Sequence, residues 1–279
     1  MENTIRKPAF AGTFYPANRN ELLEMLEYLD KNEGEKVDKS ISAHSIIGGI
    51  VPHAGYIYSG RHAVHYFKLL QNSRQHVDTI VILNPNHNGF GPAIALDGHS
   101  FWETPLGKAQ VDREFCDLLD IHISSYSHEH EHSGEVMIPF IQFYLSQLVR
   151  IVPISILDQS YTVAKELAKK LKGAISKSAK KVQIIASSDF SHFLSAKDGQ
   201  RLDAMVIQKI LKLDSKGVSK TVKENKISVC GISPIMALVE YCKINSEKTL
   251  VKVLSKGHSG EVSPSMRVVD YVSMVFLEK

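Results

Sequence analysis

Short apolar runs alternate with amphipathic stretches along this 279-residue chain. The apolar runs have the length of buried strands, and the amphipathic stretches repeat their apolar residues at helical spacing. Buried strands are predicted over residues 46–51, 78–83, 149–157 and 182–186, with a short strand at 93–96. Helices are predicted from about Asn20, from just beyond Gly60 to Leu70, and over 113–119, 140–148, 162–175, 203–213 and 234–241. Two C-terminal strands, over 249–254 and 267–276, are expected to pair antiparallel.

The repeated order of strand, loop and helix predicts a single α/β domain over residues 1–279. Helices should cover both faces of a mostly parallel, mixed sheet in three layers (α/β/α), with the C-terminal strands as an antiparallel edge. No internal repeat, low-complexity linker or change in composition divides the chain, and 43% hydrophobic residues suffice for a large core. Two segments look irregular: residues 101–107 are expected to form a turn, and the polar residues 126–135 a solvated loop.

Composition and charge exclude several classes of protein. Lys and Arg number 33 against 30 Asp and Glu, and these basic residues form no stripe with interleaved aromatics, which argues against nucleic-acid binding. No apolar stretch reaches the roughly 18 residues of a membrane span, and the N-terminus lacks the apolar core of a signal peptide. Three cysteines fit a reducing compartment better than a disulfide scaffold. We therefore expect a cytoplasmic protein with neither nucleic acid nor membrane as partner.

Three of the predicted strands are followed by a histidine close to their carboxyl end. His53, His87 and His192 each follow an apolar run within a few residues. One such histidine can be a turn residue bonded to the backbone, but three indicate a shared site, because ligands bind at the carboxyl ends of strands in open α/β sheets. His53 and His87 are 34 residues apart, which is one strand-helix-strand unit, and so are expected on neighbouring strands.

Two neutral imidazoles are enough to begin a site for a first-row transition metal. A third ligand would complete a facial set with open positions. Cys230, before Gly231 at a loop-to-helix transition, is the natural candidate because a thiolate is favoured there. The alternative is that Cys230 is a small buried hydrophobe, as we expect for Cys116 and Cys242.

The remaining chemistry lies in two polar segments. Asp189 lies three residues before His192 and can orient its imidazole, which would then act as a general acid or base; alternatively Asp189 caps the next element and His192 is a surface residue. Near the helix start of the 126–135 segment, Glu131, His132 and Glu135 are the best-fixed candidate ligands or bases. The sequence has no phosphate loop, dinucleotide fingerprint, His-Glu-x-x-His motif or nucleophile elbow.

Taken together, these motifs resemble those of the MEMO family, whose members are similar in fold to the class III, LigB-type extradiol dioxygenases. The matching stretches are Ala11–Tyr15, Pro52–Tyr58, Asn84–His87, Thr104–Leu106, Glu129–Glu135, Ser187–His192 and Cys230–Ile235. The likeness therefore extends in order from residue 11 to residue 235, and no single motif carries it.

The resemblance implies a role for each candidate residue. His53, His87 and Cys230 take the positions of ligands to iron or copper, and His192 takes that of the acid/base, supported by Asp189. Phe14 and Tyr58 would line the substrate pocket, and His132 is expected to bind substrate as well. The dioxygenases use a glutamate where this chain has Cys230, and a softer thiolate shifts the preference toward copper or a redox role. The family also implies a radical-SAM protein as partner.

Three functions stay open at this point. The first is a metal-dependent, dioxygenase-like oxidoreductase acting on a small substrate, for which an aromatic compound is one candidate. The second is a non-catalytic binding or signalling module that uses the same pocket for a peptide or a small ligand. The third is a zinc hydrolase, which would need Glu131 or Glu135 as its base.

Overall fold

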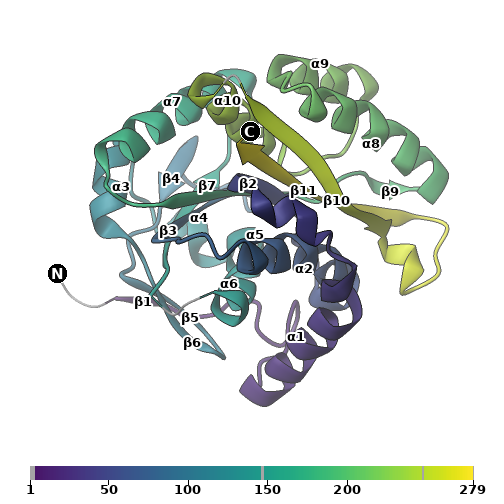
Figure 1. Cartoon of the computed structure of the whole chain (residues 1–279), viewed down its shortest axis with the longest axis horizontal. Helices are drawn as coiled ribbons and strands as arrows, with labels where there is room; N and C mark the ends of the chain where they lie inside the picture. The colour runs from purple at the N-terminus through teal and green to yellow at the C-terminus, as the bar shows by residue number, and fades with distance from the viewer. Residues whose placement is uncertain (1–3, 146–147, 247, 279) are drawn as a thin grey trace.

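The computed structural model describes residues 4–145, 148–246 and 248–278, in which strands and helices alternate (Figure 1). The strands are β1 (Ile5–Arg6), β2 (Ser45–Val51), β3 (Thr79–Pro85), β4 (Ile94–Leu96), β5 (Phe101–Thr104), β6 (Gly107–Gln110), β7 (Arg150–Ile156), β8 (Val182–Ser187), β9 (His192–Leu194), β10 (Thr249–His258) and β11 (Val268–Glu278). The helices are α1 (Arg19–Glu33), α2 (Tyr56–Ser73), α3 (Arg113–Leu119), α4 (Tyr126–Glu129), α5 (His132–Glu135), α6 (Ile138–Tyr144), α7 (Tyr161–Lys177), α8 (Ala196–Leu211), α9 (Ser215–Asn225) and α10 (Ile232–Asn245), with 3-10 turns η1 (Gly34–Lys36), η2 (Lys39–Ala43) and η3 (Ser259–Glu261). Among these described helices, none has both the length and the apolar character to cross a membrane.

The main sheet has the strand order β10-β11-β2-β8-β3-β7-β4. Its central strands β2, β8, β3 and β7 are parallel, whereas β4 at one edge and β11 and β10 at the other run antiparallel. The predicted mixed, mostly parallel sheet with the C-terminal strands at an edge is therefore confirmed.

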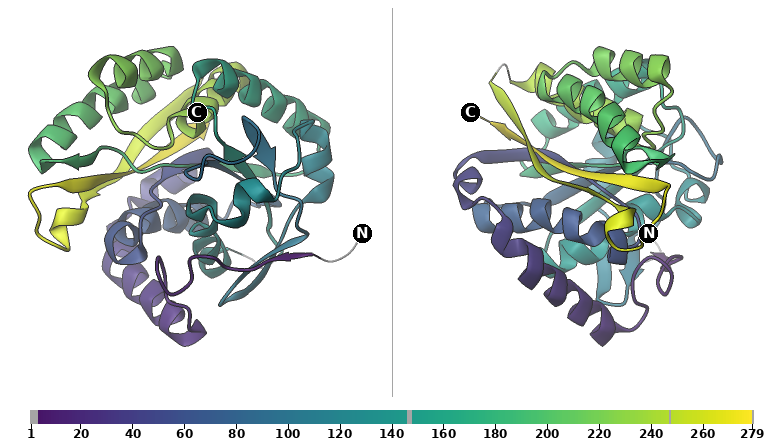
Figure 2. Two further views of the ribbon diagram at one scale, coloured as in Figure 1. Left: turned by 180° about the vertical axis from the view of Figure 1, so that it is seen from behind. Right: turned by 90° about the vertical axis from the view of Figure 1, so that its right-hand side faces the viewer.

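Helices cover both faces of this sheet, as a three-layer α/β/α fold requires (Figure 2). On one face α2 packs against β2, β10 and β11 and is itself covered by α1 and α6. On the other face α10 packs against β2, β8 and β3, and α7 and α9 lie against α10. Helix α7 illustrates why helices pack in this way. Its buried residues, which include Ala164, Leu167, Ala168 and Leu171, form one apolar stripe at helical spacing.

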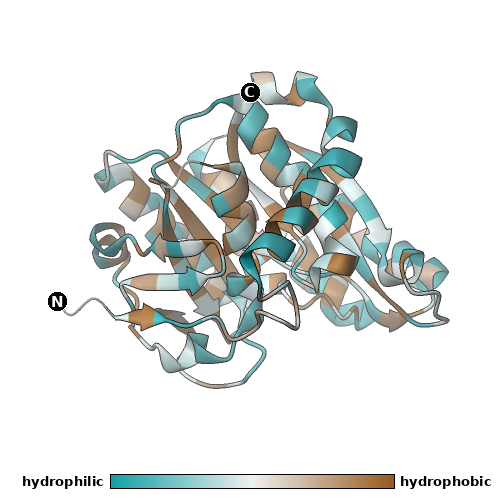
Figure 3. Ribbon diagram, turned by 90° about the horizontal axis from the view of Figure 1, so that it is seen from below, coloured by the Kyte–Doolittle hydropathy of each residue, from teal (hydrophilic) through white to brown (hydrophobic). Residues whose placement is uncertain are grey.

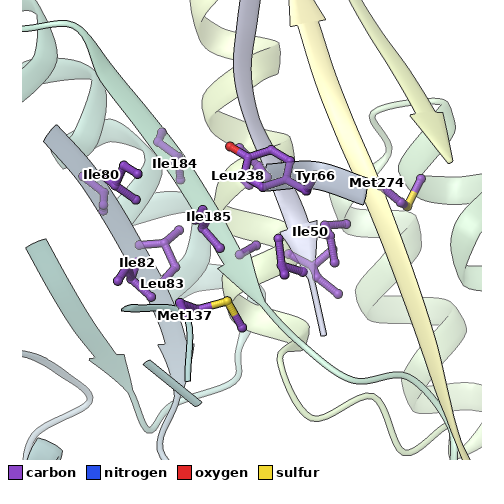
Figure 4. Close-up of a cluster of buried hydrophobic side chains, with 14 of the residues drawn as sticks. Ile50, Tyr66, Ile80, Ile82, Leu83, Met137, Ile184, Ile185, Leu238 and Met274 are labelled. Atoms are coloured by element: carbon purple, nitrogen blue, oxygen red, sulfur yellow. The ribbon is translucent and has the colours of Figure 1, made fainter. Parts of the chain in front are cut away.

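The core lies between these layers, and the apolar strands run through it (Figures 3 and 4). Ile50, Ile184 and Leu238 come from β2, β8 and α10 and are buried in the same cluster. Glycine at position 49 of β2 is required by packing, because a Cβ there would overlap the ring of Tyr66 on α2. Nearly all of the buried apolar residues in the described part of the chain form one connected cluster. A single domain over 1–279 stays a prediction.

One expectation about the sheet is wrong: β2 and β3 are not neighbours. Strand β8 lies between them and pairs with both, Gly48 facing Ile184 and Thr79 facing Val182. A right-handed crossover fixes the side of the sheet on which its helix lies, but it leaves room for a later strand to insert between the two it connects. The exits of β2 and β3 therefore flank the exit of β8.

Two local predictions are also wrong. Residues 101–107 form no irregular turn; they belong to the β5–β6 hairpin, which pairs with β1 in a separate three-stranded sheet. Residues 126–135 form α4 and α5 in place of a solvated loop, and five of their polar side chains are buried: Ser127, His128, Glu131, Ser133 and Glu135. Polarity predicts exposure only where buried partners are lacking, and here such partners exist.

The partner of the 126–135 segment is the N-terminal segment of the chain. Arg6 and Glu135 form a buried ion pair with 2.6 Å between Nη1 and Oε2. The guanidinium also lies over the Trp102 ring at 4.1 Å and donates to the carbonyls of His128 and Glu131. Glu135 in turn accepts hydrogen bonds from the Tyr15 hydroxyl and from two backbone amides, those of Ala9 and Phe10. These bonds fasten residues 5–15 to α5.

Replacing Arg6 should therefore destabilise the whole protein. Arg6→Met keeps much of the side-chain volume but leaves the Glu135 carboxylate buried without its cation, so the free energy of unfolding should fall by about 3–5 kcal/mol. Urea unfolding measures this change. Lys7→Met is the matched control, because Lys7 forms an exposed ion pair with Glu103 and should have little effect. Equal losses in the two variants would show that the buried pair is not the anchor.

Candidate metal centre

Three histidines from distant parts of the chain meet at the carboxyl ends of the central strands. His53 follows β2, His87 follows β3 and His132 begins α5, and one ring nitrogen of each lies within 4.8 Å of the other two. The rings of His87 and His132 stack with their centroids 4.7 Å apart. His53 is buried, whereas the side chains of His87 and His132 are 33% and 20% exposed. The cluster is therefore open to solvent on one side.

The tautomer of His53 follows from its hydrogen bonds. Its Nδ1 lies 2.8 Å from Oγ of Ser187, and that hydroxyl gives its single proton to the carbonyl of Ser133. His53 Nδ1 must therefore donate to Ser187, which leaves the lone pair on Nε2. Burial, followed by the neighbouring His132 and His87, holds the pKa of His53 well below its usual value, so the ring is neutral at pH 7.

His87 is fixed in the same tautomer by Glu131. One oxygen of this buried carboxylate lies 2.9 Å from His87 Nδ1, and the other accepts from the His87 backbone amide at 2.6 Å. Burial would raise the pKa of Glu131, but the hydrogen bonds from His87 and Ser133 outweigh it and hold the pKa at about 2. Because an ionised carboxylate only accepts, Nδ1 of His87 carries the proton and Nε2 keeps its lone pair.

His132 is positioned by packing. Its Nδ1 lies 3.5 Å from Glu131, and its ring lies 4.5 Å from that of Phe14 and 5.4 Å from that of Phe10, centroid to centroid. Burial lowers the pKa of His132 to about 4. His132, predicted to bind substrate, thus lies among the predicted metal ligands, and the predicted pocket residue Phe14 packs directly against it.

Cys230 lies beside His53. Its Sγ is 3.2 Å from Nε2 of His53, and the backbone amide of Asp189 donates to the sulfur at 3.2 Å. Among the described residues, His132 is grouped with His53 and His87, and the sulfur of Cys230 is outside that group. Burial raises the pKa of the Cys230 thiol, so a thiolate at this position needs a cation beside it.

Asp189 and His192 have separate partners. Asp189 is buried and accepts a hydrogen bond from the backbone amide of His53 at 2.8 Å, and burial raises its pKa to about 6. The imidazole of His192 donates through Nδ1 to the carbonyl of Ser228, at 2.8 Å, which leaves the Nε2 lone pair. Ser228 therefore orients His192, while Asp189 holds the His53 backbone. Neither Ser187 nor Ser228 was identified as a positioning residue from sequence, although Ser187 ends a strand in a matching motif.

The remaining predicted residues are Tyr58 and the two glutamates. Tyr58 is on the first turn of α2, and its hydroxyl lies 3.4 Å from that of Ser263. The candidate bases of a zinc hydrolase, Glu131 and Glu135, both accept hydrogen bonds from other residues. Glu131 accepts from His87 and Ser133, and Glu135 accepts from Arg6 and Tyr15. A carboxylate occupied in this way is a poor general base.

The donor set fits a first-row transition metal. Nε2 of His53 faces the Cys230 sulfur, and Nδ1 of His53 and of His87 is bonded to Ser187 or Glu131, which is the outer-shell pattern of metal-ligating histidines. A third imidazole and a thiol lie alongside. Imidazole nitrogen suits iron, copper and zinc, and sulfur favours copper among these.

Comparison with known proteins supports the resemblance. A family model described as "Memo-like protein" matches residues 6–275. A MEMO1 family protein of Pyrobaculum arsenaticum is 38% identical over 280 residues, covering 98% of this chain and 99% of its own. Those of Desulfurococcus amylolyticus and Methanosarcina barkeri are 39% and 36% identical, covering 97% of this chain and 98% and 99% of theirs.

Among solved structures, an uncharacterized protein of Escherichia coli K12 is similar over 82% of this chain and 99% of its own, with 12% identity and a TM-score of 0.46. That likeness is too distant to carry a conclusion about the site. The family model and the relatives cover nearly the whole length, including every segment that builds the histidine cluster. The chain belongs to the MEMO family.

Proposed function

We propose that this protein is a metal-dependent oxidoreductase, dioxygenase-like in its site, that acts on a small substrate with one iron or copper ion. The observation that carries the proposal is the cluster of His53, His87 and His132, in which buried acceptors aim the lone pairs of the first two. Bound there, the metal would supply redox chemistry and open positions for a small ligand. The protein's part is to keep His53 and His132 neutral and to fix the three rings in place.

The third ligand divides this proposal into two forms. His53 and His87 are common to both. His132 is favoured by its place in the cluster, and Cys230 by the family resemblance and by its sulfur 3.2 Å from His53 Nε2. A thiolate ligand would give the copper form a strong visible sulfur-to-copper absorption, whereas three imidazoles would not.

Metal content tests the site. His53→Ala should reduce the content from about one iron or copper per chain to near zero, because a ligand and its Ser187 bond are both lost. Elemental analysis of protein purified without chelator gives the value. His130→Ala is the matched control, since His130 is exposed in the same segment as His132 and should retain full metal.

His132→Ala and Cys230→Ser then identify the third ligand. The variant that loses its metal is the one in which a true ligand has been removed. If that ligand is Cys230, Cys230→Ser should also lose the visible absorption of the copper form. Full metal in His53→Ala would end the proposal of a metal centre in this cluster.

The low histidine pKa values predict how stability depends on pH. His53 and His132 are neutral in the folded metal-free protein, but the unfolded chain protonates near pH 6.5, so the unfolded state binds more protons as pH falls. The free energy of unfolding should therefore decrease between about pH 6.5 and pH 4, by up to about 1.4 kcal/mol per pH unit for each histidine. His132→Gln should remove one such contribution in urea unfolding at pH 7 and pH 5, and His130→Gln should not.

His192 is the proposed acid/base, with Asp189 supporting the site and Phe14 and Tyr58 on the substrate side. Its Nε2 lone pair is free because Ser228 holds Nδ1, which is the arrangement that a base needs. His192→Ala should keep its metal but lose about a hundred- to ten-thousand-fold in turnover. Oxygen uptake with a panel of catechols measures this loss, and Lys197→Ala, exposed on α8, is the control. Loss of metal from His192→Ala would instead make His192 a ligand.

The second candidate function is a binding or signalling module. Phe193 in β9 and Met266 just before β11 expose 69% and 91% of their surface, and the two strands pair, so these side chains offer apolar area for contact with a ligand. In this form the same site would take a peptide or small ligand without chemistry. Metal-loaded protein that consumes no oxygen with any catechol would favour it. A radical-SAM protein as partner and a cytoplasmic location stay predictions from the family and the composition.

A further inference from the structure

Helix α8 lies beside the hairpin of β10 and β11, where this hairpin extends beyond the main sheet (Figures 1 and 2). A pocket lies between them, apart from the histidine cluster. Its volume is about 240 Å³. Helix α8 lines it with Gln200, Asp203, Ala204 and Ile207, which share one face, and the hairpin and η3 contribute Lys256, Gly257, Glu261, Asp270, Tyr271 and Val272. None of these residues belongs to the histidine cluster.

Two buried carboxylates form its polar wall. Asp203 and Asp270 are each 3% exposed. Asp203 accepts hydrogen bonds from the hydroxyl of Ser191, at 2.5 Å, and from its backbone amide. Asp270 differs: in the described part of the chain, no amide, hydroxyl or cationic group donates to either of its oxygens, and its one polar partner is the carboxyl group of Asp203. Position 199 of α8 must be glycine for this carboxylate to fit, because a Cβ there would overlap it.

Burial, the charge of Asp203 and a hydrogen bond with Asp203 raise the pKa of Asp270 to about 8, so Asp270 keeps its proton at pH 7 unless a cation takes the place of that proton. The other charges at the pocket do not supply this cation. Glu261 adds negative charge, although Arg61 pairs with it at 3.1 Å, and Lys256 is exposed to solvent. The wall therefore lacks a cation with hydrogen-bond donors.

The shape of the pocket selects an organic cation over a metal ion. Within the described residues, three metal-ligating side chains gather only at the histidines, so a divalent ion at Asp203 and Asp270 would lack a third protein side chain. Beside the carboxylates, Ala204, Ile207 and Val272 give the pocket apolar walls suited to a short alkyl chain. A volume below the 300–1,000 Å³ of pockets for drug-sized ligands suits a small molecule.

We propose that this pocket is a second ligand site, which binds a primary ammonium group on a short alkyl chain through Asp270 and Asp203. The ammonium provides three N–H donors, which satisfy the open oxygens of Asp270, and its alkyl chain lies along the face of α8. The site shares no residue with the histidine cluster.

A protein-observed NMR titration of the full chain with n-butylammonium tests the proposal. Shifts should gather on α8 and on β10 and β11, and n-butanol, which lacks the charge, should bind at least tenfold more weakly. Asp270→Asn should weaken butylammonium binding about tenfold or more. Glu166→Gln, which removes one negative charge from the exposed face of α7, should leave it unchanged.

A second variant keeps the test decisive if Asp270→Asn does not fold. Ala204 is exposed on α8, so Ala204→Phe should fold and block the pocket while both carboxylates remain. Loss of butylammonium binding in Ala204→Phe supports the site. Comparing the affinities of butylammonium and of an Nα-acetyl-lysine amide then distinguishes a free amine from a lysine side chain as the ligand. Equal binding of butanol, unchanged binding in both pocket variants, or binding of Ca²⁺ in place of the amine would overturn the proposal.

Discussion

The buried carboxylate of Glu131 is the interaction on which the histidine cluster depends. It accepts from both the backbone amide and Nδ1 of His87, and from the amide and hydroxyl of Ser133. One ionised group thus ties the exit of β3 to the start of α5 and fixes a tautomer at the same time. An ionised carboxylate can be buried at this depth only because four donors surround it. Without this carboxylate, no shared hydrogen-bond partner would hold the imidazoles of His87 and His132 in position relative to each other.

Much of this arrangement could be predicted from the sequence, because strand ends are marked by local signals. The apolar runs before His53, His87 and Ser187 identify β2, β3 and β8, and ligands gather at such ends in any open α/β sheet. The three-layer fold follows from the same alternation. Strand order does not, since pairing depends on contacts between segments about a hundred residues apart. The insertion of β8 between β2 and β3 could therefore not be predicted from the periodicity of apolar residues.

The largest error, the solvated 126–135 segment, has the same origin. Its alternating histidines and glutamates look like surface residues until Arg6 is placed beside Glu135. A buried charge needs a partner, and this partner lies 129 residues away along the chain. The roles of Ser187 and Ser228 were missed for a related reason. A serine that orients a histidine has no pattern of its own, because the hydrogen bond, and not the residue type, gives it the role.

The residues between β8 and β9 connect both proposed sites. Ser187 orients His53, Asp189 holds its backbone amide, and Ser191 donates to Asp203 in the second pocket. The backbone of Asp270 also bonds to this segment, through Phe190 and Ser191. A cation at Asp270 would change the charge that Asp203 and Ser191 feel, and His192 is the next residue along the chain. The Ser228 carbonyl accepts from the His192 ring, so His192 is held from outside this segment. The segment 187–192 is therefore shared by the two sites, because its hydrogen bonds place the exit of β8 against both of them.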